Sequence, residues 1–190
     1  MAGAELMRIV AGSAKGRRLK TPAAGTRPPT GRMREGTFSA LGARVRDAEV
    51  LDLFAGSGAF GLEALSRGAA GATFVERSPA AVRALRDNVD AVGLGGTIVR
   101  SDVARFAASA ARAGSGPFDI VFVDPPYAMS DDAVVAILDA VAPLVAADGV
   151  VLVHRRAGAR ALEPEFLRLR RTRRYGDGEL SWYERREDTA

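Results

Sequence analysis

Short apolar runs alternate with longer amphipathic stretches along most of the chain, from residue 49 onward. The apolar runs predict β-strands at residues 50–54, 72–76, 97–100, 118–123, 150–154 and 180–185. Apolar residues at helical spacing predict helices between them, at residues 59–67, 79–92, 103–113 and 131–146. Strands that alternate with amphipathic helices are typical of a mainly parallel sheet covered by helices on both faces.

The two ends of the chain depart from this alternation. The first part predicts a small hairpin, a proline-containing loop and a helix, at residues 8–19, 21–31 and 32–41. Near the other end, Tyr-Gly-Asp-Gly at 175–178 predicts a turn, and therefore an antiparallel hairpin at the edge of the sheet. We expect an N-terminal extension at residues 1–47 and one α/β domain at residues 48–190.

Charge is distributed unevenly, although the net formal charge is only +4. Residues 8–46 hold ten Lys or Arg and one acid, and residues 155–174 hold eight Arg and two acids. Residues 47–154 between them hold seven basic and fourteen acidic side chains. Clustered basic side chains favour contact with a phosphate backbone, so residues 1–47 are predicted to bind nucleic acid.

Composition excludes several classes of site. The 190 residues include no cysteine and a single histidine, His154, so disulfides and thiolate metal sites are excluded and a structural zinc site is not expected. No apolar run approaches the roughly 20 residues of a membrane span, and the first residues lack a signal-peptide pattern. We therefore expect a cytoplasmic protein without a metal.

The sequence Asp124-Pro125-Pro126-Tyr127 directly follows the apolar run 118–123. Two successive prolines fix the backbone and remove two N–H donors, so the turn is stiff and its carbonyls are free to accept. A carboxylate, a carbonyl and an aromatic ring then lie side by side. Such a rim can accept both N–H bonds of a planar amine while the ring stacks on its face. The pattern indicates methylation of an exocyclic amino group on a nucleobase.

Residues 50–61 predict a strand, a glycine loop and the start of a helix. Gly56, Gly58 and Gly61 satisfy G-x-G-x-x-G, which alone fits NAD or FAD equally well. Asp52 lies near the end of the strand, where a buried carboxylate needs a charged or hydrogen-bonding partner. The ammonium group of S-adenosylmethionine (SAM) would supply that partner, whereas a pyrophosphate would be repelled. The loop and Asp52 together favour SAM.

Two further acids follow the next predicted strands. Glu76 ends the second strand, 20 residues after Gly56, where a carboxylate can accept both ribose hydroxyls of NAD or of SAM. Asp102 follows the third strand, where it can accept from an adenine amino group with Val103 against the ring. Asp102 also suits the N-cap of the following helix, and the two roles are compatible.

The glycine loop and the Asp-Pro-Pro-Tyr turn together resemble class I SAM-dependent methyltransferases that modify amino nitrogens. Further motifs narrow the resemblance to the RsmD family of bacterial 16S rRNA guanine-N2 methyltransferases, and they lie at residues 8–12, 16–19, 26–38, 51–58 and 61–69. The resemblance runs from about Arg8 to Tyr127 and resumes at Tyr175. Pro29 and Gly31 stand where the family more often has Thr and Asp, and residues 155–174 match no motif of the family.

The resemblance implies a Rossmann-like fold, with a mainly parallel seven-stranded sheet, an antiparallel C-terminal hairpin and a small N-terminal extension of hairpin and helix. It implies methyl transfer from SAM to the N2 amine of a specific guanine in 16S rRNA. We expect the substrate to be a partly or fully assembled small ribosomal subunit, and the protein to be a monomer.

The resemblance and the motifs together assign residues to three roles. The predicted catalytic residues are Asp124, Pro125, Pro126 and Tyr127. The predicted cofactor-binding residues are Asp52, Phe54, Ala55, Gly56, Ser57, Gly58, Glu76, Arg77, Ser101, Asp102, Val103 and Asp124. The predicted rRNA phosphate contacts are Arg17, Arg18, Arg27, Arg32 and Arg34. His154, at a predicted strand end, is expected to be structural.

Three other functions compete with this interpretation. An amino-methyltransferase acting on adenine N6, or on another RNA or DNA, would use the same Asp-Pro-Pro-Tyr turn. An NAD-binding oxidoreductase would need an acid/base pair for hydride transfer, and one histidine argues against it. A ribosome-assembly factor that only binds rRNA would have no need of intact Asp52, Glu76 and Asp124.

Overall fold

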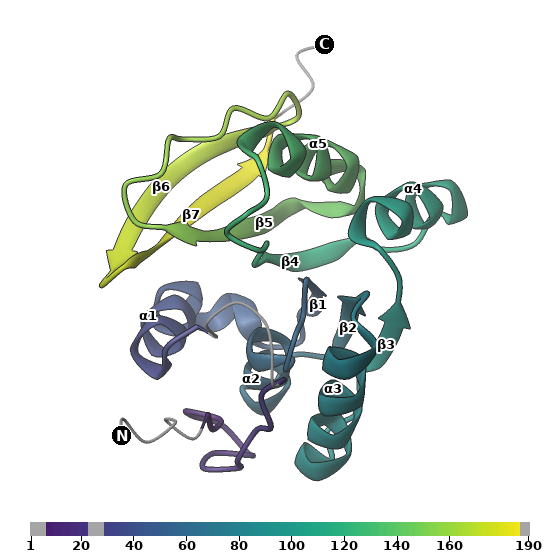
Figure 1. Cartoon of the computed structure of the whole chain (residues 1–190), viewed down its shortest axis with the longest axis vertical. Helices are drawn as coiled ribbons and strands as arrows, with labels where there is room; N and C mark the ends of the chain where they lie inside the picture. Colours follow the sequence, from purple (N-terminus) through teal and green to yellow (C-terminus); the bar gives the residue numbers. More distant parts are fainter. Residues whose placement is uncertain (1–6, 23–28, 187–190) are drawn as a thin grey trace.

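A seven-stranded sheet with the strand order β3-β2-β1-β4-β5-β7-β6 forms the centre of the protein (Figure 1). The computed structural model describes residues 7–22 and 29–186. The strands are β1 (Glu49–Leu53), β2 (Gly71–Glu76), β3 (Thr97–Arg100), β4 (Phe118–Val123), β5 (Val145–Arg156), β6 (Leu167–Tyr175) and β7 (Gly178–Arg185). The α-helices are α1 (Gly31–Leu41), α2 (Ala59–Ser66), α3 (Pro79–Val92), α4 (Val103–Ala113) and α5 (Asp131–Val141).

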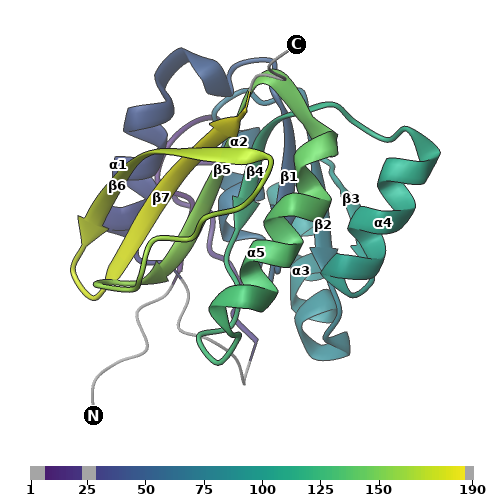
Figure 2. The same cartoon turned by 90° about the horizontal axis from the view of Figure 1, so that it is seen from above.

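The sheet is parallel from β3 to β5 and antiparallel at β7 and β6, which confirms the predicted fold. Helices α4 and α5 pack on one face, and α1, α2 and α3 pack on the other (Figure 2). The chain builds outward from β1 through β2 to β3, and then crosses to β4 on the other side of β1. Parallel sheets open a crevice at the carboxyl ends of their strands where the order reverses in this way.

Several boundaries differ from those predicted, and the strand predicted at 150–154 is longer, at Val145–Arg156. The helix predicted at 131–146 ends at Val141, and a short 3-10 turn, η2 (Ala142–Leu144), leads directly into β5. Pro143 lies in that turn, and proline cannot continue an α-helix because it lacks an N–H. The hairpin predicted at 8–19 is present in a short form, with an antiparallel bridge between Arg8 and Arg18 and backbone hydrogen bonds that join residues 7–9 to residues 16–19. The predicted C-terminal hairpin is present, but the bounds of its first strand, β6, were not predicted, because five of its nine residues are arginine and the apolar alternation ends at Leu169.

The N-terminal extension shares its core with the sheet. Met7, Ile9 and Leu19 are buried in the same apolar cluster as α1, α2 and the adjacent face of the sheet. Aromatic rings continue this contact. The ring of Phe122 in β4 stacks on that of Phe60 in α2, with 4.7 Å between the ring centres and 9° between the ring planes, and its centre lies 5.7 Å from that of the Phe38 ring in α1. The division at residue 47 therefore stays a prediction about function, while apolar packing is continuous across it.

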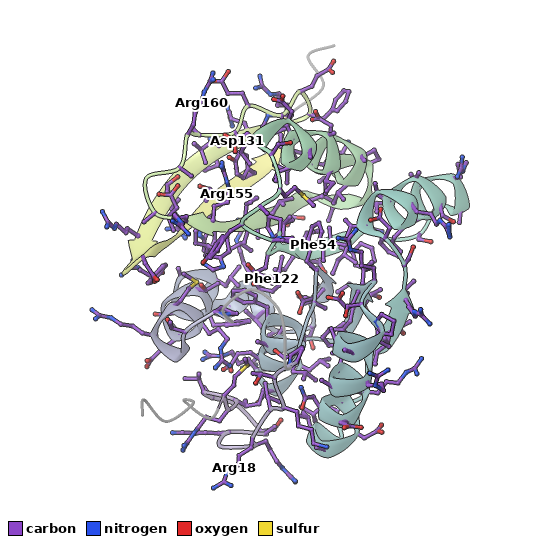
Figure 3. All side chains as sticks on the ribbon, in the orientation of Figure 1. Arg18, Phe54, Phe122, Asp131, Arg155 and Arg160 are labelled. Atoms are coloured by element: carbon purple, nitrogen blue, oxygen red, sulfur yellow. The ribbon has the colours of Figure 1, made fainter. Side chains whose placement is uncertain are left out.

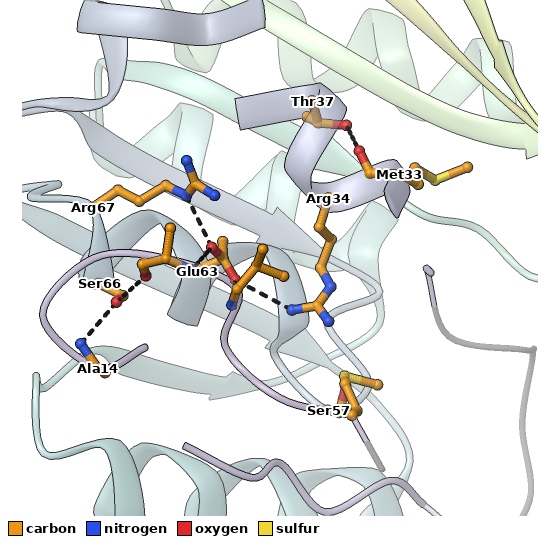
Figure 4. Close-up of polar contacts among 12 residues, drawn as sticks. Ala14, Met33, Arg34, Thr37, Ser57, Glu63, Ser66 and Arg67 are labelled. Carbon is orange, nitrogen blue, oxygen red and sulfur yellow. Dashed lines mark hydrogen bonds and ion pairs between the residues drawn. The ribbon is translucent and has the colours of Figure 1, made fainter. Parts of the chain in front are cut away.

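A buried carboxylate joins the extension to the rest of the protein (Figure 4). Glu63 of α2 is fully buried and accepts the backbone N–H groups of Val10 and Ala11, at 2.8 and 2.9 Å. It also accepts from Arg67 at 2.9 Å and from Arg34 of α1 at 3.3 Å. One side chain thus connects three segments that lie far apart in the sequence.

Arg34 was predicted to contact RNA phosphate, and the structure corrects that prediction. Its side chain is only 2% exposed and pairs with Glu63. Burial lowers the pKa of the Arg34 guanidinium from its ordinary value; the Glu63 carboxylate opposes this shift and the nearby Arg67 adds to it. Arg34 Nε has no hydrogen-bond partner within the described residues. A side chain enclosed in this way holds the fold together and does not reach a phosphate.

No helix in residues 7–22 or 29–186 is both long and apolar enough to cross a lipid bilayer.

Substitution of Glu63 by Gln is expected to lower the free energy of unfolding by about 3–5 kcal/mol, because it leaves the buried Arg34 charge without its partner. The control is Glu35→Gln, which changes an exposed acid next to Arg34 and is expected to have an effect within about 0.5 kcal/mol. Urea denaturation measures both. Equal effects of the two substitutions would contradict the central role of Glu63.

Candidate active site at the carboxyl ends of β1, β2 and β4

A cleft of about 420 Å³ opens at the point where the strand order reverses. This volume lies within the range of small-molecule sites. Phe54 lies at the cleft, and the labelled side chains of Figure 3 place it near the middle of the molecule, between β1 and β4. Residues from the ends of β1, β2 and β4 line the cleft, together with residues of the extension. The site therefore lies where the fold class places ligands.

The loop after β1 is shaped by left-handed backbone conformations. Phe54, Gly56 and Gly58 have φ values of 58°, 55° and 78°. A Cβ on Gly58 would lie 2.5 Å from Leu85 Cδ1, so this position requires glycine on both conformational and packing grounds. Gly58 begins α2 and does not line the cleft, so its observed role is to bring α2 close to α3.

Glu76 fixes the glycine loop against the start of α3. One carboxylate oxygen accepts the N–H of Gly56 at 2.9 Å, and the other accepts the N–H of Ser78 at 2.8 Å. Each carboxylate oxygen can accept more than one hydrogen bond. Glu76 therefore keeps acceptor capacity toward the cleft that it lines, which is the geometry needed to accept two vicinal hydroxyls.

Asp52 brings a buried carboxyl group to the floor of the cleft. It is 2% exposed, and one oxygen accepts the N–H of Gly61 at 2.9 Å. Burial raises the pKa of Asp52 well above its ordinary value; the hydrogen bond from Gly61 opposes the shift, and the nearby carboxylates of Asp124 and Glu76 reinforce it. Three acids around one cleft favour a positively charged ligand group, and they oppose a phosphate.

Asp124 follows β4 and lies beside the single histidine of the chain. Its Oδ1 is 2.8 Å from Nδ1 of His154, which is 4% exposed and belongs to the adjacent strand β5. The ring of Tyr127 is 42% exposed and meets His154 edge to face at 6.3 Å, while the Arg156 guanidinium lies 5.4 Å from the centre of the same ring. Pro126 borders both the main cleft and a second cavity of about 150 Å³.

Asp102 occupies the N-cap of α4. Its Oδ1 accepts the N–H groups of Ala104 and Arg105, at 3.0 and 3.4 Å, and its Oδ2 lies 3.7 Å from Arg77. The capping role, which the sequence left open, is thus observed. The neighbours Ser101 and Val103 line the cleft, whereas contact of Asp102 with an adenine amine stays a prediction.

The structure brings most of the predicted cofactor residues to this one cleft. Those that line it are Asp52, Phe54, Ala55, Gly56, Ser57, Glu76, Arg77, Ser101, Val103 and Asp124. Sequence reasoning missed a further group of lining residues, which are Thr21, Pro22, Pro29, Ala59, Phe60, Val75, Ser78 and Ala81. Thr21, Pro22 and Pro29 come from the extension, and no local pattern predicts that it folds back over the cleft.

The predicted phosphate contacts do not share one environment. Arg17, Arg18 and Arg32 are exposed, and Figure 3 shows Arg18 directed away from the body of the protein. Arg27 lies outside the described residues. Arg34 is buried, as shown above. Among the described residues, no group of three or more His, Asp or Glu side chains is placed to hold a metal ion.

Asp52→Asn tests the raised pKa. Because the folded-state pKa of Asp52 is raised, its protonated form contributes to the free energy of unfolding. This contribution is complete below the unfolded-state pKa of about 3.9, and it is lost as pH rises through the folded-state pKa. Asparagine keeps an oxygen for the Gly61 N–H but binds no proton, so the variant is expected to gain stability relative to the original protein as pH rises through that range. Urea denaturation at a series of pH values measures the difference, and a difference independent of pH would contradict the assignment.

Comparisons with known proteins agree with this geometry. The relative named "Ribosomal RNA small subunit methyltransferase D" of Escherichia coli K12 is 44% identical over 127 residues, which are 66% of this chain and 62% of the relative. The relative of the same name from Haemophilus influenzae is 34% identical over 125 residues, or 64% of each chain. The chain thus matches somewhat less than two thirds of the length of these curated relatives.

Solved structures extend the likeness over nearly the whole chain. A hypothetical protein of Thermus thermophilus is 37% identical with a TM-score of 0.82, covering 94% of this chain and 99% of that one. TrmN of Thermus thermophilus is 22% identical with a TM-score of 0.65, over 80% of this chain and 48% of that one, which supports the fold alone. The family described as "Conserved hypothetical protein 95" matches residues 7–184. With its sheet order, its acidic cleft and this match, the chain belongs to that family, the RsmD family of methyltransferases.

Proposed function

We propose that this protein transfers a methyl group from SAM to the exocyclic N2 amine of a specific guanine in 16S rRNA. The observation that carries the proposal is the position of Asp124, held by His154 at the rim of a cleft that two other acids line. The RsmD-family relatives named as small-subunit rRNA methyltransferases support the choice of substrate. Methyl transfer needs a donor pocket and an amine-holding rim next to each other, and the cleft offers both.

The residues that line the cleft fit the donor. Asp52 would meet its positively charged end, Glu76 would accept the ribose hydroxyls, and the Ser101–Val103 segment would border its adenine. When bound, SAM would supply a methyl group on a sulfonium: the N–C bond would form as the S–C bond breaks, S-adenosylhomocysteine would leave as a neutral thioether, and the amine would release one proton to solvent, so no metal is required. The glycine loop lets the backbone pass close beneath the ligand because no Cβ intervenes at Gly56.

The rim after β4 would hold the target base. Asp124 Oδ2 and the carbonyl of Pro125 would accept the two N–H bonds of the guanine amine, so that the nitrogen lone pair points at the methyl group. The half-exposed ring of Tyr127 would stack on the base. In-line positioning of this kind can lower a barrier by roughly 7–11 kcal/mol. The base must leave its stack to enter such a pocket.

His154 acts in this mechanism as a positioning residue. With the Asp124 carboxylate ionised, His154 Nδ1 carries the proton and donates to Oδ1, which leaves Oδ2 for the amine. The ring is 4% exposed and packs closely on Gly178, where an added Cβ would lie 2.6 Å from His154 Nε2. The carboxylate is thus fixed in one orientation before the base arrives.

An adenine N6 amine is the alternative target, since the same rim would accept its two N–H bonds. The acids around the cleft disfavour a pyrophosphate cofactor, and therefore an NAD-dependent oxidoreductase. The catalytic turn and its supporting histidine are of no use to a protein that only binds rRNA. We further propose that the substrate is a partly or fully assembled small subunit and that the enzyme acts as a monomer in the cytoplasm.

Labelled SAM, incubated with naked 16S rRNA and with small subunits from cells that lack this gene, tests the reaction. Identification of the product nucleoside by mass spectrometry is expected to show N2-methylguanosine at one position. N6-methyladenosine would transfer the function to the alternative amine. Absence of incorporation into both substrates, with SAM still bound, would overturn the proposed function.

Asp124→Ala is expected to reduce methyl transfer by roughly 10²–10³-fold or more, because it removes a hydrogen-bond acceptor positioned at the reacting amine. SAM affinity, measured by calorimetry, is expected to change little, because Asp52 and Glu76 remain. A variant with near-normal turnover would contradict the role of Asp124.

His154→Asn and His154→Leu separate positioning from packing. The Asn amide places an N–H near the position of Nδ1 and is expected to keep most of kcat, whereas Leu fills space without donating. The Leu variant is expected to lose up to about 10²-fold in kcat with the KM for SAM unchanged, since small misplacements of a reacting group cost that much. Equal activity of the two variants at equal thermal stability would refute the positioning role.

A further inference from the structure

Strand β6 lies at the edge of the sheet (Figure 1) and carries a row of arginines. Five of its nine residues are arginine, none is acidic, and all five arginines are exposed. None of its residues lines the main cleft or the second cavity beside Asp124. The arginines of β6 therefore lie apart from both cavities and from the rim that follows β4.

The register of the sheet places part of this strand level with the catalytic rim. Val123 pairs with Val153, so Asp124 follows beside His154; His154 pairs with Leu180, and Leu180 pairs with Arg173. Asp124 and Arg173 therefore lie in one row across β4, β5, β7 and β6. Three strand spacings separate them, which is about 14 Å.

The same register also shows from which face of the sheet the arginine side chains project. Side chains two residues apart on a strand share a face. Arg171 pairs with Trp182 and Arg173 pairs with Leu180, and both of these partners are buried in the core on the side of α1. His154, which pairs with Leu180, is on that side too and lies against Met33 of α1. Arg171 and Arg173 therefore project from the face from which His154 reaches Asp124.

Two of the arginines are held in place without using their charge. The guanidinium of Arg171 lies 3.9 Å from the centre of the Trp182 ring, and that of Arg173 lies 5.4 Å from the centre of the Tyr175 ring. A guanidinium stacked on a ring keeps its N–H groups at its edge for another acceptor. Tyr175 is itself fixed against α1, because a Cβ on Gly36 would lie 2.5 Å from its ring.

Three other arginines of the region have structural partners. Arg170 pairs with Glu184 at 2.9 Å, and Arg174 donates to the carbonyl of Gly176 in the hairpin turn. Arg155 at the end of β5 donates to Asp131 and to the carbonyl of Arg160, and Figure 3 shows these three residues gathered above β5. Within the described residues, Arg171 and Arg173 pair with no carboxylate.

We infer that Arg171 and Arg173 form a phosphate-binding surface that holds the RNA strand beside the target nucleotide. This inference rests on the proposed function, because it takes RNA as the substrate. Stacked nucleotides advance by about 3.4 Å along a strand, so the 14 Å row spans roughly four nucleotides from the base held at Asp124. The contacts are to the backbone and hold the strand in register without reading its sequence.

Protection of the sheet edge is the competing explanation, because charged side chains on an edge strand prevent pairing with other chains. Protection of the edge requires charged side chains on β6, but it does not require them to lie on one face or to be held in fixed positions. It does not explain why Arg171 and Arg173 lie against aromatic rings on the face shared with His154. The two explanations also predict different losses: RNA affinity in one case and resistance to aggregation in the other.

The test compares Arg171→Gln/Arg173→Gln with Arg83→Gln/Arg86→Gln, which removes the same charge from exposed positions on α3. Binding of naked 16S rRNA is measured at several salt concentrations without turnover, and thermal unfolding checks the fold. Each single-strand phosphate contact contributes about 0.7 to the slope of log affinity against log salt, so the β6 variant is expected to lose about 1.4. The α3 variant is expected to keep the original slope.

Trp182 provides a second readout, because it is the one tryptophan of the chain and lies under Arg171. Its fluorescence is expected to change on titration with rRNA in the original protein, and to change less in the β6 variant. SAM affinity is expected to stay the same in both variants. An unchanged salt slope in the β6 variant, or equal losses of slope in both variants, would contradict the proposed phosphate-binding surface. Failure of methylation alone would instead overturn the proposed function, since binding is measured separately.

Discussion

The buried carboxylate of Glu63 is the interaction on which the arrangement of this protein depends. It accepts hydrogen bonds from two backbone groups of the extension and from two arginines, Arg34 of α1 and Arg67 at the end of α2. A buried charge is tolerated only when it is paired and hydrogen-bonded, and here four donors satisfy one side chain. Since α2 starts at the glycine loop, the same contact relates the extension to the floor of the cleft.

The chemistry of the site follows from where the strands end. Asp52, Glu76 and Asp124 come from three adjacent strands and therefore meet at one carboxyl edge. Their mutual repulsion and the burial of Asp52 raise the electrostatic energy of the cleft, and a cationic ligand relieves that cost. His154, from the neighbouring strand β5, fixes the orientation of Asp124. Adjacent parallel strands thus bring together acids that lie far apart in the sequence.

Local sequence patterns predicted the parts of the structure that depend on local physics. The glycine loop, the strand that ends at Glu76 and the Asp-Pro-Pro-Tyr turn could all be located, because glycine and proline constrain the backbone wherever they occur. Arg34 could not be separated from Arg32, since one helix carries both and only tertiary packing turns one of them toward Glu63. The C-terminal hairpin was predicted from its turn, but the bounds of β6 could not be located because its arginines mask the alternation that marks a strand.

Local patterns also could not predict that His154 pairs with Asp124, or that Pro22 and Pro29 line the cleft. Both depend on how distant segments dock, and neither leaves a periodic signal in the sequence. Pro143 shows the opposite case, because its effect on the end of α5 is local and the residue itself is enough to shorten the predicted helix.

The folding of the extension over the cleft has a consequence for the order of events at this site. Pro22 and Pro29 form part of the cofactor wall, while Arg17, Arg18 and Arg32 of the same extension are exposed. A ligand in the cleft therefore contacts the same segment that carries those cations. Binding free energies are reciprocal, so any gain in RNA affinity that a filled cleft brings must equal the gain in cofactor affinity that bound RNA brings. One short segment can thereby couple the binding of the two proposed ligands.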